Sequence, residues 1–267
     1  MVLIKFIYRE VVNDAVLELI SSFLNSLYSA ALYYAALRVF SEQYAMLASV
    51  GIVLSYFIVR TRSSGTSTDA WIFRPEYVLA ELPVPPVAVF RLAWFVSSAI
   101  SCAATLVNFY ILQLVLGHLR VVPSCPPTVP LLAALASPAV SLFMELQSAI
   151  QRYVFSVLSF RIFSLISKKI EISYSFVRNI VSRISFLLIS FLYSATPIYY
   201  TYASMPWWAK PLALVNPQTF LIEAGRGGMD PVAAAAAIAL SLCAYYVANE
   251  RLFERFVEAR RSGRSAM

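Results

Sequence analysis

The chain has 267 residues, of which 60% are hydrophobic and 13% are charged, and its net charge is +7. A soluble domain averages closer to half apolar and a quarter charged, so this composition argues against a water-soluble protein and predicts an integral membrane protein. Three widely spaced cysteines and a single histidine argue against a Cys/His metal site. The basic residues fall between apolar segments, which is the pattern of membrane topology and not of nucleic-acid binding.

Six apolar segments are candidates for helices that cross the ~30 Å hydrocarbon core. They cover residues 19–37, 43–59, 92–117, 127–150, 184–203 and 231–249. Residues 1–15 mix apolar and charged positions and predict a short amphipathic helix at the inner interface, unless they are only the start of the first span. The predicted fold class is therefore all-α, with six transmembrane helices in one domain over residues 1–267.

The basic residues predict the orientation of these spans. With the N-terminus inside the cell, 17 of the 21 Lys and Arg residues fall in inner segments. The outer segments hold only Arg38, Arg120, Lys210 and Arg226. The positive-inside rule then places both termini in the cytoplasm of a multi-pass protein of the cell membrane, and an even number of spans agrees with this.

The inner segment between the second and third spans predicts a docking helix. A polar loop around Gly65 is followed by a stretch from Asp69 to Leu82 that mixes aromatic and charged residues, and Pro83 ends it. Such a helix suits docking into a groove on another protein, although it could also lie on the lipid surface. The candidate docking residues are Asp69, Trp71, Arg74, Glu76, Tyr77 and Glu81.

The segment before the last span, residues 204–228, is too long for a turn and too apolar for a hydrated loop. Its sequence is SMPWWAKPLALVNPQTFLIEAGRGG, from Ser204 to Gly228. The prolines exclude one continuous helix, and the adjacent tryptophans suit the headgroup level. We therefore expect a re-entrant hairpin of two short helices, broken near Asn216 or Pro217, with the second helix at 218–226. Its candidate gate residues are Pro206, Trp207, Trp208, Asn216, Pro217, Glu223 and Arg226.

Several motifs in this region resemble the end of an ABC-2 type transporter permease. They are Ile198-Tyr199-Tyr200, Met205-Pro206-Trp207-Trp208, Leu214-Val215-Asn216-Pro217-Gln218-Thr219-Phe220 and Glu223-Ala224-Gly225-Arg226. Ser64-Gly65-Thr66 and Leu82-Pro83-Val84-Pro85-Pro86 are similar to the family's first cytoplasmic loop. Two departures are Ser63-Ser64, where the family often has a Glu, and Gln218, where it usually has an apolar residue.

The resemblance implies a membrane subunit of an exporter, paired with an identical or homologous permease and with two copies of an ATP-binding subunit. The docking and N-terminal helices would contact the ATP-binding subunit and transmit its conformational change. The hairpin would cap the pathway on the outer side. The sequence contains no G-x-x-x-x-G-K-[ST] motif, so this chain is not expected to be an enzyme or to bind a cofactor. ATP and Mg are expected on the partner subunit.

Three polar residues inside the predicted spans are candidates for the translocation pathway. Glu145 lies in the fourth span, where an ionisable group marks a pathway or an ion pair unless the span ends before it. Asn25 and Asn108 lie in the first and third spans, and such groups more often join helices than bind cargo. Glu223 and Arg226 are three residues apart, so they are expected to pair with each other or to cap the broken backbone.

Two other functions stay open on the sequence alone. A non-transporting anchor or assembly protein would share the layout and show no nucleotide-linked change. An ion-coupled secondary transporter often has broken helices in both halves, whereas here only the second half has one. A membrane enzyme is disfavoured because the acidic and nucleophilic residues form no recognisable set.

Overall fold

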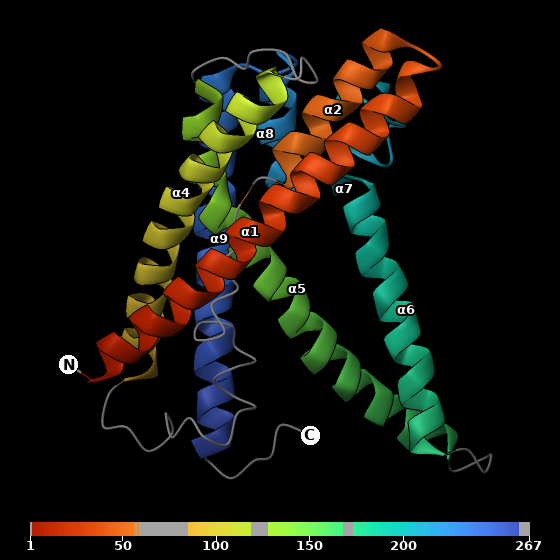
Figure 1. The fold of residues 1–267 in the computed structure, drawn as a ribbon. Coiled ribbons are helices and arrows are strands. Elements are labelled where there is room, and N and C mark those ends of the chain that lie inside the picture. The colour runs from red at the N-terminus through yellow and green to blue at the C-terminus, as the bar shows by residue number, and fades with distance from the viewer. Residues whose placement is uncertain (1, 57, 59–84, 119–127, 168–172, 262–267) are drawn as a thin grey trace.

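The computed structural model describes residues 2–56, 58, 85–118, 128–167 and 173–261, and these residues form helices without any strand (Figure 1). The helices, in chain order, are α1 (Val2–Arg38), α2 (Glu42–Tyr56), α4 (Pro86–His118), α5 (Thr128–Ile166), α6 (Tyr174–Ser194), α7 (Lys210–Val215), α8 (Gln218–Gly225) and α9 (Pro231–Arg261). A 3₁₀ turn, η2, covers Tyr202–Ser204. The prediction of an all-α chain is confirmed for this part of the protein.

Four of these helices are long and apolar enough to cross a membrane. The segments are Phe90–Val115 in α4, Thr128–Ser148 in α5, Tyr174–Leu192 in α6 and Pro231–Arg255 in α9. The segments in α4, α5 and α9 agree closely with the spans predicted at 92–117, 127–150 and 231–249. The membrane character of the chain therefore rests on four helices of the described residues.

The segment predicted as the fifth span, 184–203, is displaced. The helix begins earlier, at Tyr174, and ends at Ser194. Pro197 explains the early end, because a proline pushes the residue before it out of the helical region and supplies no N–H. The nine residues after Ser194 instead belong to the irregular segment that leads to α7.

The first two predicted spans lie on α1 and α2, which are not among the four candidate segments. α2 has 15 residues, so its length of about 22 Å is less than the hydrocarbon core. α1 is one helix of 37 residues, and the separate interfacial helix expected at 1–15 is not distinct from it. The reason is local: residues 2–38 contain neither Gly nor Pro to interrupt the helix.

α5 occupies the middle of the bundle and contacts α4, α6, α8 and α9, while α1 packs against α2 and α4. Figure 1 shows α1 crossing the other helices at an angle and α6 meeting α5 near the chain turn between them. The main core cluster draws buried residues from α1, α2, α4, α5, α8 and α9. The short helix α8 is thus part of the core, although it lies between two long helices in the sequence.

A proline inside α5 is accommodated by a neighbouring helix. Pro138 has no N–H to donate to the carbonyl of Ala134, one turn earlier. The Cys102 thiol of α4 donates to that carbonyl at 3.1 Å. The hydroxyls of Ser101 and Ser137 are in contact beside this bond and are buried. Small polar groups therefore join α4 to α5 beside Pro138, as is common between helices in membranes.

Candidate functional site: the segment between α6 and α9

Four prolines divide the chain between Ser194 and Pro231 into short pieces. Pro197 follows the end of α6, and Pro206 follows η2. Pro211 lies in the first turn of α7, where its missing N–H is tolerated. Pro217 separates α7, which ends at Val215, from α8, which begins at Gln218. The break between two short helices falls at Asn216 and Pro217, as the sequence indicated.

The corner between α7 and α8 is buried, and its side chains satisfy one another and the backbone. Asn216 Nδ2 donates to Thr196 Oγ1 at 2.8 Å, and its Oδ1 accepts from the Gln218 N–H at 3.1 Å. Gln218 Nε2 donates to the carbonyl of Ser55 in α2 at 3.0 Å. Thr219 Oγ1 donates to the carbonyl of Ala213 at 2.5 Å. The corner is therefore tied to both α2 and the end of α6.

The end of α8 uses glycine for its backbone conformation. Gly227 has a φ of 75°, in the left-handed region that favours glycine. Its N–H donates to Ala224 O at 3.0 Å, and the Gly228 N–H donates to Glu223 O at 2.8 Å. These two bonds form a Schellman motif, which satisfies the last carbonyls of the helix. The motif reverses the chain toward α9.

Arg226 follows α8 and binds the backbone of two other segments. Nε and Nη2 donate to Leu47 O of α2 at 3.2 and 2.9 Å, and Nη1 donates to Pro197 O at 2.6 Å and Tyr200 O at 2.7 Å. Nη2 also donates to Ile198 O. We call Arg226, Glu223 and these four carbonyls the Arg226 clamp.

The clamp uses the full donor capacity of the guanidinium. One bond from Nε, two from Nη1 and two from Nη2 account for all five N–H groups of an arginine. The Arg226 side chain is only 6% exposed. It therefore has no donor left for an anionic cargo, and its role in this conformation is to hold three segments together.

Glu223 completes the clamp on its charged side. Its Oε1 lies 3.7 Å from Arg226 Nη1 and accepts from the Tyr202 N–H at 3.0 Å. Burial lowers the pKa of Arg226 from its usual value, and the Glu223 carboxylate acts in the opposite direction. Glu223 and Arg226 therefore pair with each other and also bind irregular backbone, which are the two arrangements predicted for them.

Two glycines allow α2 to approach the clamp and α8. A β-carbon on Gly51 would overlap the carbonyl oxygen of Ile198 and the Arg226 guanidinium. A β-carbon on Gly225 would overlap the Leu54 side chain of α2. Glycine is required at position 51, where the obstacle is backbone, whereas at position 225 the obstacle is the end of a flexible leucine side chain. Gly51 is not among the residues predicted from the sequence. The pattern that could have indicated it is a single glycine within an apolar helix, α2.

The candidate gate residues separate into a buried and an exposed group. Asn216 and Glu223 are buried at opposite ends of α8, next to Pro217 and Arg226. Pro206 and the two tryptophans are exposed, with Trp207 at 83% and Trp208 at 51%. Of the two tryptophans, Trp208 lies beside the end of α6, where its ring stacks on Phe191 with centroids 6.2 Å apart.

The candidate pathway residues do not form one group. Asn108 is fully buried in α4 and donates to Ser22 Oγ of α1 at 2.9 Å, which is a contact between helices. Asn25 is exposed and donates to Ser21 on its own helix at 3.3 Å. Glu145 is half-buried in the last turn of the apolar part of α5. A pathway role for these three residues stays a prediction.

The candidate docking helix at 69–82, with Asp69, Trp71, Arg74, Glu76, Tyr77 and Glu81, lies outside the described residues. The structure does describe α4, which begins shortly after it. Near that beginning Arg91 Nε lies 2.6 Å from Glu250 Oε1 of α9, and the Tyr246 hydroxyl is 3.4 Å from the same oxygen. These contacts join the beginning of α4 to the last helix.

Comparison of the chain with protein-family models, curated proteins and solved structures gave no significant match. The described part of the chain is helical, with four helices suited to a membrane and, before the last of them, a proline-broken segment whose α7–α8 corner is buried.

Proposed function

We propose that this chain is the membrane-spanning permease subunit of an ATP-driven exporter of the ABC type. In this proposal it pairs with a second permease, identical or homologous, and with two copies of a separate ATP-binding subunit. The observation that carries the proposal is the buried break between α6 and α9, together with the resemblance of its motifs to ABC-2 permeases.

The physical argument concerns backbone polar groups. Irregular backbone is tolerated at membrane depth only where protein or a watery cavity satisfies its N–H and C=O groups. The α7–α8 corner and the Arg226 clamp supply such partners from Thr196, Ser55 and the buried guanidinium. These contacts support a re-entrant hairpin that enters from the outer side and caps the pathway, with Trp207 and Trp208 at the headgroup level.

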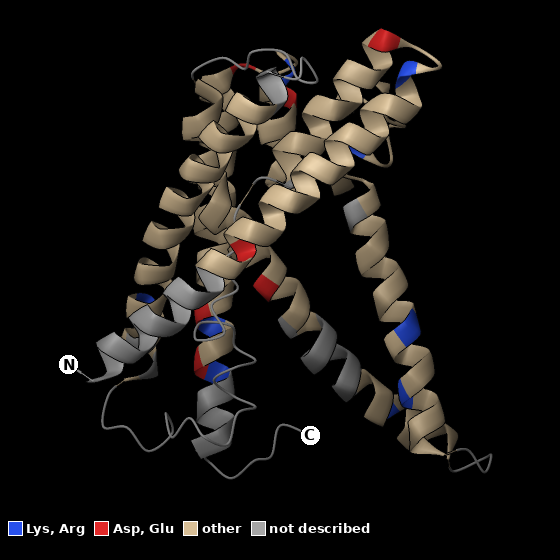
Figure 2. Cartoon of the chain, viewed as in Figure 1, with Lys and Arg blue, Asp and Glu red and all other residues tan. Residues whose placement is uncertain are grey.

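The distribution of charge supports the orientation. Figure 2 shows described Lys and Arg residues toward the lower ends of α4, α6 and α9, the end of the bundle where α1 begins. Arg91, Arg178, Arg183, Arg251 and Arg255 belong to this group. By the positive-inside rule this end faces the cytoplasm of a cell-membrane protein, and the α7–α8 end faces outward.

The count of six spans includes α1 and α2 in this proposal. α1 is long enough, at about 55 Å, to cross the core and extend beyond it. Its exposed residues Leu17, Ile20, Leu24 and Tyr28 form a stripe at helical spacing that suits contact with lipid or a second permease. The shorter α2 reaches the clamp and is continued by segment 57–84, outside the described residues except for Ile58.

The test is purification of the tagged full chain from its native membrane in a mild detergent, followed by mass spectrometry of the proteins that accompany it. A stoichiometric P-loop ATPase is the expected result and would also reveal any second permease. A matched control is the same purification with a tagged, unrelated multi-pass protein. A preparation without an ATPase, under conditions that preserve known transporter complexes, would favour a non-transporting anchor or an ion-coupled transporter.

A further inference from the structure

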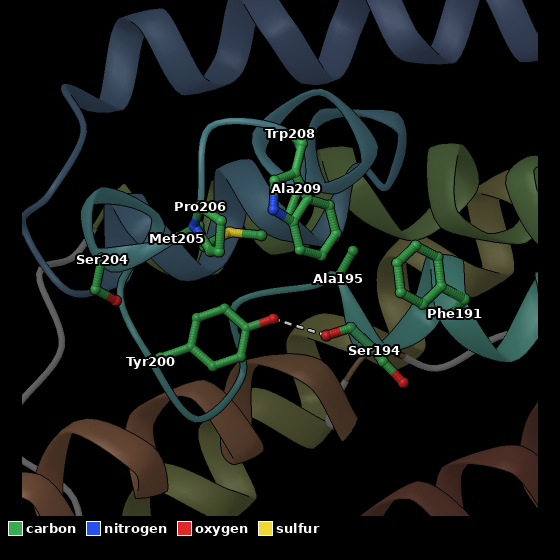
Figure 3. A pocket seen from close by; sticks show the side chains of 9 residues that line it. All are labelled: Phe191, Ser194, Ala195, Tyr200, Ser204, Met205, Pro206, Trp208 and Ala209. Atoms are coloured by element: carbon green, nitrogen blue, oxygen red, sulfur yellow. Dashed lines mark hydrogen bonds between the residues drawn. The ribbon is translucent and has the colours of Figure 1, made fainter.

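A second feature of the segment is a cavity of about 350 Å³ at the end of α6, which shares Tyr200 with the Arg226 clamp. Figure 3 shows the nine side chains around it, from Phe191, Ser194 and Ala195 at the end of α6 to Trp208 and Ala209 before α7. Its volume falls at the lower end of the range of roughly 300–1,000 Å³ that ligand pockets occupy. The cavity begins where the apolar part of α6, Tyr174–Leu192, ends.

The hydroxyl groups in the lining of the cavity donate to backbone carbonyls, so they are not available as donors to a ligand. The Tyr200 hydroxyl donates to Ser194 O at 2.7 Å, Ser194 Oγ donates to Ser190 O at 2.9 Å, and Ser204 Oγ donates to Thr201 O at 2.8 Å. The donors are thus used by the protein's own carbonyls. The stacked rings of Phe191 and Trp208 form one wall. A ligand part that enters this space is therefore a hydrocarbon and not a polar head.

A single cation lies beside the cavity. Lys210 follows the lining residue Ala209 and is the only charged residue between Ser194 and Ile222. Its Nζ lies 5.6 Å from the Tyr202 ring centroid, and it forms no ion pair with the described residues. An ammonium group without a carboxylate, next to an apolar cavity at the end of a membrane helix, is complementary to an anionic amphiphile.

We propose that this cavity binds one acyl chain of an anionic phospholipid of the bilayer, with the lipid phosphate on Lys210 and Trp208 at the boundary between chain and head. This site does not depend on transport: it needs only the membrane location of α6. Its occupant would anchor the α6–α7 connection to the bilayer surface.

The test uses the purified full chain in nanodiscs that contain a phosphatidylglycerol or a phosphatidylcholine with a photoreactive acyl chain. The expected result is labelling of residues 191–209 that is stronger for the anionic probe. Lys210→Gln should lower the anionic labelling about fivefold, since one Lys near a membrane surface contributes that factor to anionic-lipid binding. Arg178→Gln, an exposed cation elsewhere on α6, should leave it unchanged.

A second pair of variants tests the cavity and not the charge. Ser204→Trp fills the cavity from an exposed rim position and should abolish the labelling at 191–209, whereas Ser182→Trp, at an exposed position of α6 outside the cavity, should not. If Ser204→Trp fails to fold, Trp208→Ala removes the stacked wall and should also reduce labelling. Equal labelling by both lipids would overturn the proposal, and so would labelling that is unchanged in Ser204→Trp. A third contrary result is labelling that occurs only when a photoreactive free fatty acid replaces the phospholipid probe.

Discussion

Gly51 of α2 lies directly against Arg226, and the contact leaves no room for a β-carbon at position 51. The same position faces the carbonyl oxygen of Ile198, which belongs to the backbone and cannot move aside cheaply. α2 can therefore approach the clamp this closely only because residue 51 has no side chain.

Gly51→Ala is expected to destabilise the protein by about 1–3 kcal/mol, the usual cost of overpacking a filled site. The measurement is thermal unfolding of the purified chain in detergent. The sign of the stability change is informative by itself, because Gly→Ala in an unhindered helix stabilises the protein by roughly 0.5–1 kcal/mol. A rise in the midpoint would show that α2 does not contact the clamp as described.

Arg226→Gln should cost about 3–5 kcal/mol, because it leaves Glu223 as a buried charge without its partner. Arg226→Lys should recover only part of the loss, since an ammonium keeps the charge but cannot reach carbonyls in the planar fork geometry. Arg38→Gln is the control: Arg38 is exposed and 3.7 Å from Glu42, so its loss should change stability by less than about 1 kcal/mol. If Arg226→Lys unfolds at the wild-type temperature, the clamp contributes charge and not geometry.

The hydrogen bond from α4 beside the proline of α5 gives a prediction about Cys102 and Pro138. Cys102→Val should cost about 1 kcal/mol, because the Ala134 carbonyl loses its donor from α4. Pro138→Ala restores an N–H at position 138, so the same Cys102→Val change should then have little effect. Stability measured for the two single variants and the double variant checks this. Purely additive effects would contradict the link between the thiol and the proline.

The Arg91–Glu250 pair should report on coupling between α4 and α9. Arg91 is 63% exposed in its side chain, so water screens the pair and its contribution to stability should be small. Arg91→Glu and Glu250→Arg should each impair ATP-linked transport under the proposed function, and the exchanged double variant should restore it. Transport assays in vesicles with the co-purified ATPase measure this. Failure of the double variant to restore transport would assign the two residues separate roles.

Charge reversal at Glu76 and Glu81 addresses the predicted docking helix. The double variant Glu76→Lys, Glu81→Lys should uncouple the ATPase subunit while expression stays normal, because like charges then face the surface that the glutamates contact. Glu42→Lys, in the first turn of α2, is the matched control. Normal coupled ATPase activity in the double variant would place the docking surface elsewhere.

The sequence by itself determined the helical class, the apolar spans at α4, α5 and α9, and the break at Asn216-Pro217. These features are local: they depend on runs of apolar residues and on prolines, which act on their own stretch of backbone. The predicted span 184–203 extends past the end of α6 because apolar and aromatic residues continue beyond Ser194, whereas Pro197 ends the helix before them.

The tertiary structure decided which groups meet. Every residue carries a carbonyl acceptor, so the sequence contains no sign that Arg226 binds those of Leu47, Pro197, Ile198 and Tyr200. Likewise, the need for glycine at position 51 arises only when α2 is brought against a segment nearly 150 residues later, from Ile198 to Arg226. Local pattern sets where helices begin and end, whereas packing between distant segments sets which polar groups become buried and must find partners.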